Sequence, residues 1–100
     1  MGERNNVKLV PDGIIIYSHW DDKQSLISKV KKALIRGKER WNDRQYLNRI
    51  IFSEVIRDDV PGLTGYGLTT DMHDGDIILT VDTENQRVGK KSFEEFVKVK

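Results

Sequence analysis

Residues 7–17, VKLVPDGIIIY, decide the fold that we expect for this chain. Two short runs rich in β-branched residues, 7–10 and 14–17, flank the turn tripeptide PDG at 11–13, a pattern typical of a β-hairpin. The second run is apolar at consecutive positions instead of alternating. We therefore expect residues 14–17 to form a central strand that is covered on both faces.

Two amphipathic helices are predicted after this hairpin. Asp21 is the expected cap of the first helix, which should end at Gly37, and Asn42 is the expected cap of the second, which should end near Asp58. The second helix has the heavier apolar load and is predicted to be the centre of the core. Its apolar positions are Tyr46, Leu47, Ile50, Ile51, Val55 and Ile56.

The C-terminal part predicts a meander of strands at 66–72, 76–82 and 86–90, with Asp74-Gly75 as a two-residue hairpin turn between the first two. A capping box at 92–95 then opens a short helix. The order is β-β-α-α-β-β-β-α, and strands and helices are segregated instead of alternating. We expect one α+β domain, residues 1–100, with a mostly antiparallel sheet and the helices packed on one face.

Composition excludes several classes of protein. The 100 residues contain no cysteine, so disulfides, thiolate metal sites and a cysteine nucleophile are ruled out. The longest apolar run is far shorter than the roughly 20 residues that span a bilayer, and the N-terminus lacks the apolar segment of a secretory signal. We expect a cytoplasmic protein without membrane contact.

Charge is unevenly distributed although the net charge is only +1. Residues 23–44 contain eight Lys or Arg and two acids, whereas residues 71–84 contain five acids and neither Lys nor Arg. This asymmetry favours attraction of an anionic ligand, or head-to-tail association into a dimer or larger assembly. A solvated helix face is the alternative interpretation.

The best candidate for an anion site lies around Arg40 and Trp41. A guanidinium can hold a phosphate through paired hydrogen bonds, and an indole can stack on a base. Arg36 and Arg44 extend the basic character of this segment. In the alternative interpretation, Trp41 packs against the second helix and the basic residues are solvated.

Two further segments are candidates for ligand contact. The glycine-rich loop offers backbone N–H groups and hydroxyls, but it leaves a helix and enters a strand, which is the wrong context for a nucleotide-binding fingerprint. A plain structural turn is the alternative. The candidates in this loop are Thr64, Gly65, Tyr66, Gly67 and Thr69. At the end of the strand at 14–17, the candidates are Tyr17, His19 and Trp20, with simple packing as the alternative.

No catalytic or metal site is expected. Ser18 and His19 are adjacent on a strand and point to opposite faces, so they do not form a catalytic pair. His73 lies near Asp71, Asp74 and Asp76, but these acids lack the spacing of a calcium loop. We therefore predict no cofactor, no metal and no enzymatic activity.

Several segments resemble a family of small uncharacterised phage and prophage proteins. They are YSHW at 17–20, ALIRG at 33–37, RWND at 40–43, YLNRIIFSE at 46–54, TGYGL at 64–68 and SFEEF at 92–96. The resemblance covers nearly the whole chain and implies a phage or prophage setting, without implying a reaction.

Small phage proteins without catalytic motifs often act by binding. The leading hypothesis is a binding protein that sequesters a phosphorylated, nucleotide-like small molecule used in host defence. A small nucleic-acid-binding module that uses the basic face of the first helix is the second hypothesis. An inhibitor of a host protein is the third.

Overall fold

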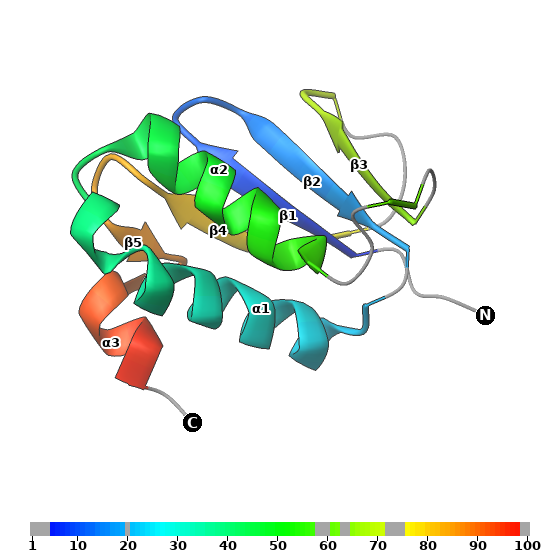
Figure 1. Cartoon of the computed structure of the whole chain (residues 1–100). Coiled ribbons are helices and arrows are strands. Elements are labelled where there is room, and N and C mark those ends of the chain that lie inside the picture. The colour runs from blue at the N-terminus through cyan, green and yellow to red at the C-terminus, as the bar shows by residue number, and fades with distance from the viewer. Residues whose placement is uncertain (1–4, 20, 58–60, 63–64, 72–75, 99–100) are drawn as a thin grey trace.

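A six-stranded sheet in the order β3-β2-β1-β4-β5-β6 forms one layer of the protein (Figure 1). The computed structural model describes residues 5–19, 21–57, 61–62, 65–71 and 76–98. The strands are β1 (Asn5–Val10), β2 (Ile14–Ser18), β3 (Tyr66–Thr69), β4 (Asp76–Asp82), β5 (Arg87–Val88) and β6 (Lys91–Ser92). Only the β1–β4 pair is parallel among these, so the predicted mostly antiparallel sheet is confirmed.

The N-terminal hairpin is confirmed. β1 and β2 pair antiparallel, with Leu9 opposite Ile14, and the N–H of Gly13 donates to the carbonyl of Leu9 at 2.8 Å. Gly13 has φ of +80°, a conformation that favours glycine. Ile15 and Ile16 point to opposite faces of β2, and both are buried, as the run of apolar residues predicted.

The predicted meander is wrong for its first pair of strands, whereas the antiparallel pairing of its second pair, β4 with β5, is confirmed. The strand at 76–82 forms as expected, but β4 pairs with β1, and β3 lies two strands away, beside β2. The Asp74-Gly75 turn lies outside the described residues, and it cannot join two neighbouring strands in this order. In the observed order, Leu79 and Val81 pair with Val7 and Leu9 beneath the helices, where all four contribute to the apolar core.

The helices are α1 (Lys23–Arg36), a single turn η1 (Lys38–Arg40), α2 (Arg44–Val55) and α3 (Phe93–Lys98). Both long helices begin one residue later than predicted: Asp22 caps α1 through a 2.8 Å bond from the N–H of Ser25, and Asp43 precedes α2. α1 ends before Gly37, as predicted. A Cβ on Gly37 would lie 3.1 Å from the carbonyl oxygen of Ala33 and 3.2 Å from Ile50, so glycine allows α2 to approach closely here.

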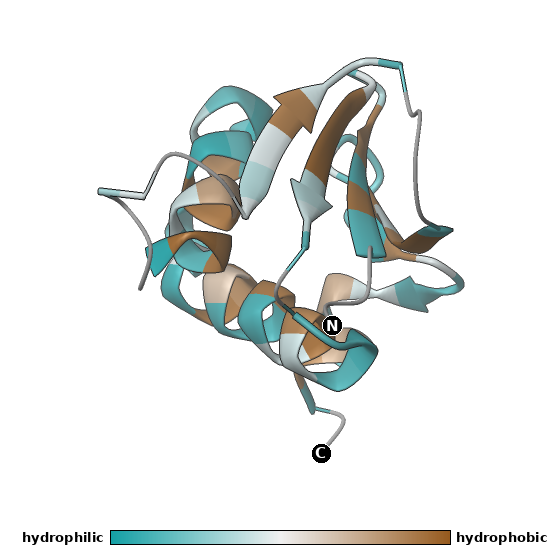
Figure 2. Cartoon of the chain, turned by 90° about the vertical axis from the view of Figure 1, so that its right-hand side faces the viewer, coloured by the Kyte–Doolittle hydropathy of each residue, from teal (hydrophilic) through white to brown (hydrophobic). Residues whose placement is uncertain are grey.

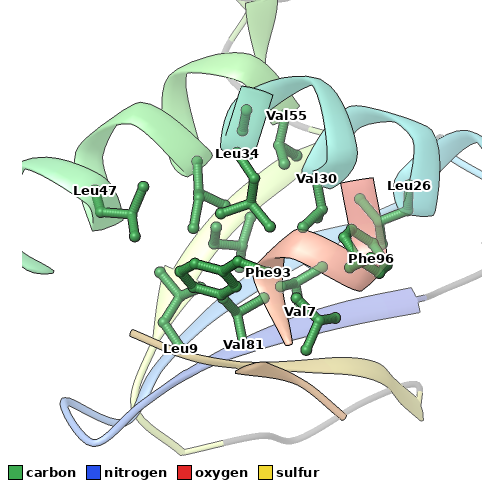
Figure 3. Packing of buried hydrophobic residues seen from close by; sticks show 14 of the residues in the cluster. Val7, Leu9, Leu26, Val30, Leu34, Leu47, Val55, Val81, Phe93 and Phe96 are labelled. Atoms are coloured by element: carbon green, nitrogen blue, oxygen red, sulfur yellow. The ribbon is translucent and has the colours of Figure 1, made fainter. Parts of the chain in front are cut away.

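α1 and α2 lie on one side of the sheet, and their apolar faces meet those of β1, β2 and β4 (Figure 2). Leu47 and Ile51 are fully buried, which confirms α2 as part of the core. Tyr46, which the sequence pattern placed on the same apolar face, is 59% exposed. Figure 3 shows how Phe93 and Phe96 from α3 close the core beside Leu34 and Val30 of α1.

Candidate anion-binding groove

A groove of ≈ 310 Å³ runs between the C-terminal end of α1 and the outer face of α2. Arg49 and Ser53 stand one turn apart on the same face of α2, and Arg57, just beyond the end of this helix, lines the same groove. Arg36, the last residue of α1, faces them from the other side. The two helices thus bring together three guanidinium groups that are up to 21 positions apart in the chain (36 to 57).

Glu54 organises this groove. Its side chain is only 8% exposed, and its carboxylate accepts from Arg36 Nη1 at 3.0 Å and from Arg57 Nη1 at 3.4 Å. Both arginines remain more than half exposed. Arg49 forms no ion pair with any other described residue. Among the described residues that line the groove, three carry a positive charge and one a negative charge, an excess of two.

The structure does not bring Arg36, Arg40 and Arg44 together as the sequence hypothesis required. Arg44 pairs with Asp12 at 3.3 Å and Glu84 at 3.6 Å and lines a different hollow. The guanidinium of Arg40 lies 5.1 Å from the ring centroid of Tyr46. Among the predicted arginines, only Arg36 lines the groove.

Trp41 is a core residue, so the prediction that its ring stacks on a base is wrong. Its side chain is buried, its Nε1–H donates to the carbonyl of Leu34 at 2.9 Å, and its ring meets Phe93 edge-on at 5.2 Å. Trp41 is therefore packed, as the alternative interpretation held, but the contacts that hold it come from Leu34 of α1 and Phe93 of α3 and not from the second helix. Burial of this large ring is more favourable than its exposure, and the partner Phe93 comes from the distant α3.

A second polar cluster lies where β2, α1, α2 and β3 meet, and it includes the predicted site residue Tyr66. The hydroxyl of Tyr66 donates to Asp21 Oδ2 at 2.9 Å, and Lys29 Nζ lies 2.9 Å from Asp21 Oδ1. Lys29 also donates to Tyr66 Oη and to the carbonyl of Val55, both at 3.0 Å. Ser18 and Ser25 donate their hydroxyls to Asp21 as well.

Hydrogen bonds favour the charged forms of Asp21 and Lys29. Burial raises the pKa of Asp21, but hydrogen bonds from Lys29, Tyr66 and Ser25 outweigh burial and hold that pKa below its ordinary value. Burial opposes the charge of Lys29 too, yet hydrogen bonds to Tyr66 and Asp21 leave its pKa raised. Burial and the bond to Asp21 raise the pKa of Tyr66. None of the three is poised to exchange a proton near neutral pH, so the cluster is a structural clamp.

The remaining predicted residues of the glycine loop have structural contacts. The carbonyl of Gly65 accepts from the N–H of His19 at 2.8 Å, and Gly67 pairs with Tyr17 across β3 and β2. Thr69 Oγ1 forms a local turn with Asp71. These bonds fit the alternative interpretation, a structural turn. Trp20 and Thr64 lie outside the described residues.

Sequence reasoning missed Arg49, Arg57, Ser53 and Tyr46. The signal was present for Arg49, Ser53 and Arg57, because they recur at a spacing of four. The apolar pattern of the same helix obscured it.

No family model, curated protein or solved structure matches this chain. Within the described ranges, no helix has the length and apolar character to cross a membrane, and no group of three or more His, Asp or Glu side chains is arranged to hold a metal ion. His73 and Asp74 of the rejected calcium-type loop are not among these residues.

Proposed function

We propose that this protein is a non-enzymatic binding protein that captures a phosphorylated, nucleotide-like small molecule in the groove between α1 and α2. The observation that carries the proposal is the meeting of Arg36, Arg49 and Arg57 around the buried Glu54. Glu54 holds two of the guanidiniums in place, and the third is open to an anion.

The chemistry of the groove favours phosphate. Each guanidinium has five N–H donors in a planar fork, and Glu54 occupies only part of this capacity on Arg36 and Arg57. Charge-assisted bonds from such forks to phosphate oxygens are about twice as strong as neutral hydrogen bonds. Ser53 adds a hydroxyl between Arg49 and Arg57.

An exposed aromatic ring on the same helix as Arg49 supports a nucleotide-like ligand. Tyr46 precedes Arg49 by three positions on α2, a spacing that makes them neighbours on the helix surface. More than half of Tyr46 is accessible, and Arg40 lies over its ring. A base stacked on Tyr46 would place its phosphates toward Arg49.

The nucleic-acid hypothesis is less well supported. It uses the basic face of the first helix, which carries Lys29, Lys32 and Arg36. The ammonium of Lys29 instead lies in the clamp with Asp21, and Arg44 is paired with two acids. A compact anion fits three clustered arginines better than a strand whose phosphates are spread along a helix. The phage setting and the inhibition of a host protein remain predictions.

Isothermal titration with ADP and with inorganic pyrophosphate tests the proposal. Arg49→Ala should weaken binding of both at least tenfold, because it removes the one guanidinium of the groove without an ion-pair partner in the described structure. Arg87→Ala is the matched control, since Arg87 carries the same charge on β5 and does not line the groove. Equal loss in both variants would show attraction by net charge only. Failure of the unaltered protein to bind either anion would reject the proposal.

Titration of the protein with a 20-nucleotide single strand distinguishes the proposed small-molecule binding from the nucleic-acid alternative. Binding through several phosphates must weaken steeply with salt, with a log–log slope of about −0.7 per phosphate neutralised. Tight binding of the strand with a steep slope, and none of ADP, would favour the nucleic-acid module.

A further inference from the structure

The strand β4 is paired along only part of its outer side. It pairs with β1 from one end to the other, but β5 pairs only with Val81 and Asp82. The carbonyl of Thr80 accepts one further bond, from the N–H of Gly89 at 3.0 Å. On the side away from β1, residues 76–79 therefore have no strand partner within the described part of the chain (Figure 1). We call residues 76–79 the free edge of β4.

A glycine turn explains why the pairing stops. If β5 continued in the same antiparallel register, Lys90 would lie opposite Leu79. Instead, Gly89 has φ of +59°, a conformation that favours glycine, and the chain reverses into β6, where Lys91 pairs with Val88. The turn directs the chain away from the free edge. A sheet edge of this kind is a template for a further strand.

A groove of ≈ 320 Å³ lies beside the free edge, and we call it the lysine groove. Leu79 of the free edge forms part of its floor together with Val88, and the helices α1 and α3 contribute Ile27 and Phe96. Val88 and Phe96 are buried, whereas Ile27 and Leu79 are partly buried. An apolar side chain that entered this groove would be removed from water against four apolar residues, which is favourable.

Lysines form the rim of this groove. Lys31 on α1 and Lys90 and Lys91 at the turn between β5 and β6 line it, and no acidic side chain does so among the described residues. Lys90 and Lys91 are exposed and form no ion pair with another described residue. Glu95, on the first turn of α3, instead accepts from the N–H of Ser92 at 3.0 Å. The groove is therefore complementary to a partner with negative charge.

A free sheet edge, an apolar floor and a basic rim together fit one mode of recognition. An extended peptide can add a strand to an exposed sheet edge, and its main-chain hydrogen bonds then supply affinity. Alternate side chains of such a strand point to one face, so one of them can enter an apolar pocket while those two positions away reach its rim. A small amphiphilic anion would use the groove without the edge, and a nucleic acid would use the lysines without the apolar floor.

We propose that the free edge of β4 and the lysine groove bind an extended peptide in which acidic side chains lie two positions to either side of an apolar one. The peptide pairs with residues 76–79, its apolar side chain rests on the floor of the groove, and its acids pair with Lys90 and Lys91. This inference is independent of the arginine groove formed around Arg49, because the two grooves share no residue.

The probe is a fluorescently labelled synthetic peptide, TDTLTDT, in which the leucine and both aspartates share one face of an extended strand. Anisotropy should show binding, and hydrogen exchange should become slower at the amides of residues 77–79. A form N-methylated at its central amides, which cannot donate to the edge, should bind roughly tenfold more weakly. The same loss is expected for TDTSTDT, which lacks the apolar side chain. Absence of binding by TDTLTDT, or undiminished binding by the N-methylated form, would overturn the proposal.

A reversal of charge tests the role of the lysines. The double variant Lys90→Glu/Lys91→Glu should bind TDTLTDT roughly tenfold more weakly, and it should bind TKTLTKT more tightly than the unaltered protein does. Lys23→Glu/Lys32→Glu is the matched control, because both lysines are exposed on α1, lie outside the groove and give the same change in net charge. Equal losses in the two double variants would show attraction by net charge only and would contradict the proposed site.

Sedimentation of the protein alone tests a second copy of the chain as the occupant. A dimer that Lys90→Glu/Lys91→Glu dissociates, together with no binding of TDTLTDT, would show that the free edge is an interface between copies and would overturn the proposal. Pyrophosphate binding should be unchanged in the same double variant. That measurement distinguishes a failure of the peptide site from a failure of the arginine groove.

Discussion

Lys29 Nζ and Asp21 Oδ1 lie 2.9 Å apart in a pocket from which water is largely excluded, with side chains 20% and 7% exposed. Tyr66 Oη is within 3.0 Å of both residues, and Val55 contributes a backbone carbonyl to the ammonium. This pair joins the start of α1 to the end of α2 and to β3. These contacts tie both helices to the edge of the sheet.

Removal of one partner of this pair should be severely destabilising. Lys29→Met would leave the carboxylate of Asp21 buried without its cation, at an expected cost of about 3–5 kcal/mol in the free energy of unfolding. Urea denaturation monitored by circular dichroism would measure it. Lys32→Met, three positions along α1 and exposed, is the control and should change stability by less than about 0.5 kcal/mol. Similar small effects in both variants would contradict the assigned role.

The same pair predicts the pH dependence of stability. The pKa of Asp21 is lowered from its ordinary 3.8, so its contribution is complete above that pH and is lost as the pH falls through the lower folded-state pKa. Lys29 has a pKa raised from 10.5, so its contribution is complete below that value and is lost as the pH rises beyond it.

Urea midpoints measured from pH 2 to 7 give the loss of stability at low pH, which we call the acid limb. Asp21→Asn should flatten this limb but not abolish it. The pKa of Asp82 is also lowered, by bonds from the side chain and backbone of Asn85, and that of Glu95 by bonds from Ser92. An acid limb as steep in Asp21→Asn as in the unaltered protein would assign it to other carboxyls.

Trp41→Ala should lower stability by about 3–5 kcal/mol, because the ring is buried against Phe93 and its N–H is bonded to Leu34. Thermal unfolding of the variant measures the loss. Tyr46→Ala is the matched aromatic control, and it should leave stability within about 0.5 kcal/mol while weakening ADP binding. The reverse result, with Tyr46 essential for stability and Trp41 dispensable, would require a different packing of α2.

Ile51→Ala should cost about 2–5 kcal/mol, because this side chain is fully buried in the core. The neighbouring Ile50 is only partly buried and borders the arginine groove, so Ile50→Ala should cost clearly less. Denaturant unfolding of both variants gives the comparison. An equal loss would indicate that α2 is rotated from its described position.

Self-association remains a prediction from the separation of basic and acidic segments. Light scattering should show an assembly that weakens as salt is added, because salt screens attraction between exposed charges. An assembly insensitive to salt would indicate an apolar interface, for which the exposed Leu68 is the first candidate.

The sequence by itself determined the local elements and the fold class. The hairpin at 7–17, the end of α1 at Gly37, and the strand at 76–82 follow from β-branched runs, glycine and turn residues, which act over a few neighbouring positions. Segregation of strands from helices predicted the α+β class. Local patterns were less accurate at the helix caps, where Asp22 and Asp43 replace the predicted Asp21 and Asn42. Asp21 is drawn into the clamp with Lys29, a contact between residues eight positions apart.

Only the tertiary structure decided which strands pair and which side chains meet. β4 pairs with β1 across about 70 intervening residues, because burial of apolar surface under the helices outweighs a local turn preference. The same packing removed Trp41 from the surface, exposed Tyr46, and brought Arg36 to Arg49 and Arg57. A sequence pattern shows which residues share a face of one element, whereas a binding site arises where the faces of different elements meet.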